Sequence, residues 1–160
     1  METLTITSNG TTGEEWINSR LQQRKPTFCF KDDIKNSLTS PAFKPTVDVR
    51  SEVVIIPGSE FDSNGRCHEE ILAYAKLNNL VQPTIEQCYL AIEKLHEEIP
   101  TPNSDKYYSQ IGSHHFIMWP ADLNKTIISA DCGNCVWISS ENIDEVPLGA
   151  ICSFIFIKQS

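Results

Sequence analysis

The most regular hydrophobic pattern in the chain lies between Pro83 and Ile99. Apolar residues recur there at alternating steps of three and four, which places them on one stripe of an α-helix that faces a core. The stripe consists of Ile85, Cys88, Ile92, Leu95 and Ile99. Thr84 and Gln87 have the spacing of a capping box, and Pro100 ends the pattern. We therefore expect a central amphipathic helix around which the rest of the chain is organised.

Three further segments have helical patterns. Thr12 and Glu15 form a second capping-box pair, followed by a short amphipathic helix through Gln23. Another short helix is expected to begin near Asp32, after a turn. The apolar positions of 67–80 predict a third helix, which a short link joins to the central helix as an αα-hairpin. Residues 1–11 are polar and are expected to form a flexible N-terminal tail.

The strand patterns lie mostly in the second half of the chain. Glu52–Ile56 is a β-branched run ended by Pro57-Gly58, which predicts a buried strand. Strand composition then recurs in 115–119, 125–130, 135–139 and 150–157. No linker-like segment marks the change from helical to β pattern. We therefore predict a single α+β domain over 12–160, with helices packed on one face of a mainly antiparallel sheet.

Composition and charge narrow the function classes. The 160 residues, 40% of them hydrophobic, suffice for one compact domain. A net charge of −8, with no cationic run longer than Arg24-Lys25, argues against nucleic-acid binding. Residues 1–13 lack the pattern of a signal peptide, and nowhere do 18 apolar residues follow one another. The expected protein is soluble, cytoplasmic and independent of membranes, with its six cysteines reduced.

Cys132-Gly133-Asn134-Cys135 is the most distinctive short motif. Its spacing is shared by redox dithiols and by one half of a zinc site. Because the flanking segments have strand composition, Gly133-Asn134 also fits a two-residue hairpin turn, which is the interpretation we favour. A metal half-site and a redox pair remain open as alternatives. We accordingly expect no cofactor, with zinc as the alternative.

A zinc site at Cys132 and Cys135 would need further ligands. His114 and His115 are the main candidates, although neighbouring residues of a strand point to opposite faces. Other candidates are Cys67, His68 and His96. The sequence contains no second Cys-x-x-Cys pair, no phosphate-binding glycine loop and no converging set of catalytic residues. The catalytic residues, if any, are therefore unknown from the sequence.

The polar face of the central helix is acidic. Glu86, Glu93 and Glu97 fall opposite the apolar stripe, and Glu98 lies at its border. An acidic patch can speed the encounter with a basic protein partner. These three glutamates are the predicted binding surface, although a merely solvated helix face has the same pattern.

Three segments together carry a resemblance to known proteins. They are Thr12–Ile17, Leu38–Thr46 with its Ser-Pro-x-Phe-Lys-Pro-Thr sequence, and Glu52–Ile56. In these segments the chain resembles a family of small uncharacterised bacterial proteins. The resemblance implies a helical region over 67–96 and a final strand similar to Ser153–Ile157. It implies no activity and no site residue.

The leading hypothesis is a non-enzymatic binding or accessory protein that acts through contact with another protein. The first alternative is a metal- or thiol-dependent enzyme centred on Cys132, Cys135 and a histidine. The second alternative is a secreted effector without a cleavable signal.

Overall fold

The computed structural model describes residues 1–19, 27–30, 32–62, 67–98, 115–131, 135–142 and 152–159. The helices are α1 (Gly13–Ser19), α2 (Asp32–Leu38), the 3-10 turn η1 (Gly58–Glu60), α3 (His68–Leu77) and α4 (Ile85–Glu98). The strands are β1 (Glu2–Asn9), β2 (Thr27–Phe30), β3 (Val47–Pro57), β4 (Leu80–Val81), β5 (His115–Met118), β6 (Thr126–Asp131), β7 (Cys135–Glu141) and β8 (Cys152–Lys158).

All the described strands belong to one sheet, with the order β1-β3-β8-β5-β6-β7-β2 and β4 added beside β8. Neighbouring strands are antiparallel except for β5 beside β8 and β2 beside β7. The predicted α+β fold with a mainly antiparallel sheet is confirmed. None of the described helices is long and apolar enough to cross a membrane.

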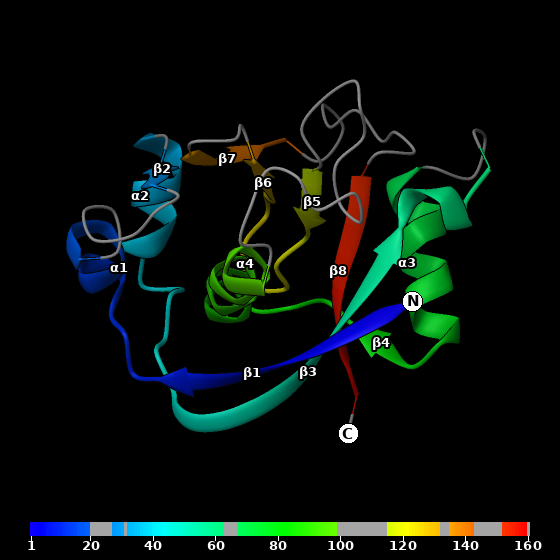
Figure 1. The fold of residues 1–160 in the computed structure, drawn as a ribbon, viewed down its shortest axis with the longest axis horizontal. Helices are drawn as coiled ribbons and strands as arrows, with labels where there is room; N and C mark the ends of the chain where they lie inside the picture. Colours follow the sequence, from blue (N-terminus) through cyan, green and yellow to red (C-terminus); the bar gives the residue numbers. More distant parts are fainter. Residues whose placement is uncertain are drawn as a thin grey trace.

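The sheet curves around α4, with β1 and β3 on one side of the helix and β5, β6 and β7 on the other (Figure 1). Of the predicted stripe, Ile85, Cys88, Ile92 and Leu95 are buried, which confirms its orientation, whereas Ile99 lies outside the described residues. Burial also raises the pKa of the Cys88 thiol. The predicted capping box is present: Gln87 N donates to Thr84 Oγ1 at 3.2 Å, and Thr84 N donates to Gln87 Oε1 at 2.9 Å. Local sequence therefore determines where this central helix begins.

The second capping box is confirmed at α1. Thr12 N donates to Glu15 Oε2 at 2.7 Å and Glu15 N to Thr12 Oγ1 at 3.2 Å, and these bonds lower the pKa of Glu15. Gly13 follows the cap, and a Cβ there would lie 1.8 Å from the carbonyl oxygen of Leu38 at the end of α2. Only glycine permits this approach of the two helices. The predicted continuation of α1 to Gln23 lies outside the described residues.

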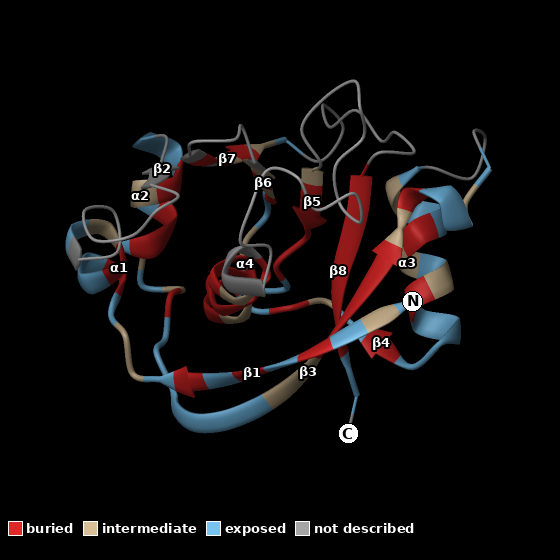
Figure 2. Cartoon of the chain, in the orientation of Figure 1, coloured by how far each residue is buried: buried red, intermediate tan, exposed pale blue. Residues whose placement is uncertain are grey.

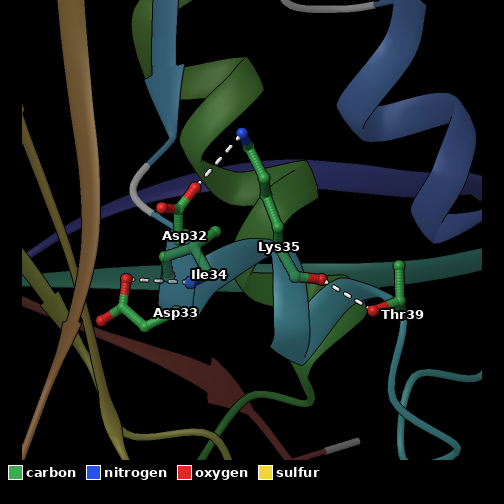
Figure 3. Close-up of polar contacts among 5 residues, drawn as sticks. All are labelled: Asp32, Asp33, Ile34, Lys35 and Thr39. Carbon is green, nitrogen blue, oxygen red and sulfur yellow. Dashed lines mark hydrogen bonds and ion pairs between the residues drawn. The ribbon is translucent and has the colours of Figure 1, made fainter.

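Helix α2 begins at Asp32, as predicted, and its acidic first turn connects it to the sheet. The Asp33 carboxylate accepts a hydrogen bond from Ile34 N at 3.0 Å (Figure 3) and from Ser140 Oγ of β7 at 2.8 Å. Lys35 forms an ion pair with Asp32 at 3.5 Å on the exposed side. Asp33 thus holds α2 against β7, beside α4.

Two segments differ from the sequence prediction because they become strands only through pairing. Residues 2–9, expected as part of a flexible tail, form β1 and pair with β3. Leu4, Ile6 and Ser8 are buried at alternate positions, the first two in the cluster around α4, but the intervening threonines make the segment look polar. Residues 27–30, expected as a turn, form β2 and pair in parallel with β7.

Helices α3 and α4 lie on opposite faces of the sheet, so the predicted αα-hairpin is wrong. Ile71 and Ala75 of α3 belong to a cluster with Val54 and Phe154, whereas α4 packs in the cluster that contains Val53, Ile55 and Ile155. Alternate residues of a strand point to opposite faces, which separates the two helices. The helices were expected on one face of the sheet: α1, α2 and α4 do share a face, whereas α3 covers the other. Between α3 and α4 the chain forms β4, which pairs with β8.

Candidate binding groove

The predicted acidic surface is largely buried. Glu86 is 6% exposed and Glu93 is 8% exposed, while the side chain of Glu97 lies outside the described residues. The Glu86 carboxylate accepts hydrogen bonds from Thr46 N at 2.8 Å and from Thr46 Oγ1 at 2.7 Å. The prediction of an acidic docking face is therefore wrong for Glu86 and Glu93. A helical pattern shows which residues oppose the core stripe, but it cannot show that a curved sheet covers the helix on more than one side.

The candidate metal ligands are only partly described. Cys132 and His114 lie outside the described residues, and for Cys135 only the backbone, the first residue of β7, is described. Strands β6 and β7 pair antiparallel up to Asp131 opposite Val136, as the hairpin interpretation requires. Among the described residues, no three His, Cys, Asp or Glu side chains gather as they would around a metal ion. The zinc alternative stays a prediction.

His115 is half-buried at the start of β5, opposite Ala130 of β6 and Cys152 of β8. Desolvation lowers the pKa of His115 below its usual value of 6.5. The unfolded chain then binds a proton more readily than the folded chain, so this residue favours folding above pH ~6.5 and that contribution is lost as the pH falls.

We expect the urea midpoint of the parent to decrease between pH ~7 and pH ~5 more steeply than that of His115→Gln. Equal slopes would contradict this.

A solvent-accessible groove lies where β8 ends beside β3. The two strands pair from Val53 opposite Ile157 to Pro57 opposite Ser153, but β3 extends in the other direction as far as Val47. Figure 2 shows the corresponding change along β3, from a buried inner half to an exposed outer half. Beside the unmatched part of β3 opens a groove of about 610 Å³. The groove thus occupies a place in the sheet that a further strand would fill.

Local backbone geometry shapes this outer half of β3. Asp48 adopts a positive φ of 58°, and the pairing of β1 with β3 shifts register between Thr7 and Asn9. Irregularities of this kind bend a strand and increase its twist. The outer β1–β3 ribbon accordingly curves around α4 (Figure 1).

The walls of the groove combine apolar, polar and charged groups. Val49 of β3 and Val81 of β4 are 49% and 41% exposed and supply apolar surface. Glu52 and Lys158 form an ion pair of 3.0 Å, and Gln87 Nε2 donates to Ser51 Oγ at 3.0 Å. These four polar side chains therefore form two pairs within the groove wall.

Arg50 differs from its neighbours in the groove wall. Its side chain is exposed, and no carboxylate in the described part of the chain lies within ion-pair distance of its guanidinium. A guanidinium presents several donors in a planar fork that matches a carboxylate. Arg50 is thus the charged group of the groove that is available to a ligand.

A second, smaller concave site of about 380 Å³ lies near the start of α4. Trp119 and His68 contribute to it, but the Trp119 ring is buried, lies 5.5 Å from Phe154 in a stacked pair and meets the His68 ring at 4.7 Å. Asp122 accepts a hydrogen bond from Ile85 N at 2.9 Å, and Gln82 donates to the Trp119 carbonyl at 3.1 Å. These polar and aromatic groups of the cleft therefore already have partners within the protein and serve to pack the chain around the first turn of α4. Trp119 thus belongs to the core cluster around α3.

Comparisons of the chain with protein-family models, curated proteins and solved structures find no match. The resemblance to small uncharacterised bacterial proteins stays a prediction. No sequence pattern marks the residues of the groove. Val49 and Arg50 lie near Val81 and Lys158 only because β8 ends beside the middle of β3.

Proposed function

We propose that the protein is a non-enzymatic binding module that accepts an extended, carboxylate-bearing segment of a partner protein in the groove beside β3. The observation that carries this proposal is the unmatched length of β3 next to the end of β8, with Arg50 available in the groove wall. An open strand edge offers backbone donors and acceptors to an added strand. The groove volume of about 610 Å³ also falls in the usual range of ligand sites.

Side-chain chemistry supports the same kind of ligand. In an added strand, alternate side chains point to opposite faces, so apolar side chains could contact Val49 and Val81 while a carboxylate meets Arg50. The proposed partner is thus a protein, as the sequence suggested, but it presents an acidic and not a basic group. Because the net charge of the chain is −8, the attraction must be local to Arg50.

Selection from a displayed library of random peptides tests the proposal. The parent is expected to enrich peptides with Asp or Glu among β-branched residues, and Arg50→Glu to enrich Lys or Arg instead. Lys76→Glu places the same charge change on the exposed side of α3 and serves as the matched control, which should keep the parent's preference. No enrichment by the parent, or the same charge preference in Arg50→Glu, would contradict the proposed function.

A further inference from the structure

Strand β1 forms an open edge of the sheet. It pairs with β3 on one side, and no other described strand pairs with it on the opposite side. Its side chains alternate: Leu4 and Ile6 are buried against α4, whereas Thr3, Thr5 and Thr7 are exposed. The backbone edge of a strand presents unpaired donors and acceptors at every second residue.

Between Thr3 and Thr7 this edge lacks the devices that usually prevent strands from pairing between molecules. Residues 2–9 contain neither proline nor lysine, and their one charge is that of Glu2 at the first position. The register irregularity with β3 falls at the far end, between Thr7 and Asn9. A regular, uncharged edge rich in threonine and aliphatic residues is a template for another strand.

We propose that a second copy of this chain adds its β1 antiparallel to β1, about a twofold axis at Thr5. The sequence Thr3-Leu4-Thr5-Ile6-Thr7 has the same pattern in both directions. In this register Thr3 lies opposite Thr7 of the copy, Leu4 opposite Ile6, and Thr5 opposite Thr5. Paired threonines can form hydrogen bonds on the exposed face, and the Leu–Ile pairs extend the core cluster around α4 from one molecule to the other. Glu2 falls opposite Ser8, so the pairing opposes no like charges.

This inference does not depend on the proposed function. The groove opens mainly along the edge of β3 that faces away from β1, and Thr5 is the residue of the proposed dimer contact that also lines it. Sedimentation reports dimerisation separately from any effect of the Thr5 substitutions on the groove. Edge pairing of one strand buries less than the ~1,200 Å² of a standard interface, so we expect a reversible dimer with a micromolar dissociation constant.

Sedimentation equilibrium on the full chain tests the dimer with two complementary variants. The first changes Thr3, Thr5 and Thr7 to Lys, and the second changes the same three residues to Glu. Each places three pairs of like charges across the twofold axis and is expected to weaken dimerisation roughly a hundredfold. An equimolar mixture of the two opposes Lys to Glu at every position and should restore a dimer.

Changing the three threonines to Ser keeps the hydroxyl groups without adding charge and is the matched control, which should remain dimeric. Thermal unfolding of each variant shows whether it is folded. A parent that stays at the 18.0 kDa of the single chain at every attainable concentration overturns the proposal. So does a folded Lys variant as dimeric as the parent, or a mixture of folded Lys and Glu variants that remains monomeric.

Discussion

Replacing Ile92 with Asp is expected to unfold the protein. Ile92 is 1% exposed and lies in the middle of α4, where the sheet curves around the helix. A carboxylate there would lose its hydration without gaining a partner, which costs several kcal/mol. The total stability of a domain is ~5 to 15 kcal/mol, so this loss removes much or all of it. Circular dichroism and thermal unfolding of the purified variant would measure the effect.

Leu77→Asp supplies the matched control for this substitution. Leu77 is also a helical aliphatic residue, but it is 83% exposed at the end of α3, where a carboxylate stays hydrated. Because helix propensity and the helix dipole both disfavour Asp at the last residue of a helix, we expect a loss of about 1 kcal/mol in the free energy of unfolding, well below the loss for Ile92→Asp. If Ile92→Asp melts within a few degrees of the parent, α4 is not the centre of the fold.

Truncating Glu86 to Ala is expected to lower the free energy of unfolding by about 2 to 3 kcal/mol. The substitution leaves Thr46 N and Thr46 Oγ1 without their shared acceptor, and it opens a cavity beside the first turn of α4. It also removes a negative charge from the N-terminal turn of a helix, where the helix dipole favours one. Glu86→Gln keeps one acceptor oxygen and should lie between the parent and Glu86→Ala.

A double-mutant cycle separates the Glu86–Thr46 contact from general effects of truncation. Thr46→Val removes the hydroxyl donor while keeping the side-chain shape. If the contact stabilises the fold, Glu86→Ala and Thr46→Val together cost less than the sum of the two single changes. Strict additivity in urea unfolding would contradict a stabilising bond between the Thr46 hydroxyl and Glu86 and would leave the Thr46 N–H as the donor that stabilises the carboxylate.

The features that sequence predicts correctly are those that depend on nearby residues. The Thr84–Gln87 and Thr12–Glu15 capping boxes each involve groups three residues apart, so their chemistry is visible in the sequence. The buried run Val53–Ile56 is visible for a related reason, since a strand covered on both faces lacks polar alternation.

Features that depend on pairing between distant segments were missed. β1 is a strand because β3, 38 to 53 residues later along the chain, supplies its hydrogen-bond partners. α3 and α4 lie on opposite faces because β4 pairs with the end of β8, which no local pattern of 77–84 reveals. Glu86 has the helical position of a solvent-facing residue, but it is buried and its carboxylate binds Thr46, 40 residues earlier in the chain.

The groove belongs to this second group. Lys158 at the end of β8 forms an ion pair with Glu52 of β3. Arg50 lies two residues further along β3, beyond Val53, the last described residue of β3 that pairs with β8. Sequence shows a basic residue near the start of a strand. Only the relative lengths of β3 and β8 make that residue part of a concave site.

Amide chemical shifts of isotope-labelled protein, followed during titration with the most enriched acidic library peptide, test the groove most directly. We expect the largest changes in residues 49–52 and 157–159, with a smaller change at Val81, and their loss in Arg50→Glu. The same peptide with Asn or Gln in place of its acidic residue should bind more weakly. Changes centred instead on His68 and residues 119–125 would place binding in the cleft at the start of α4 and contradict the proposed function.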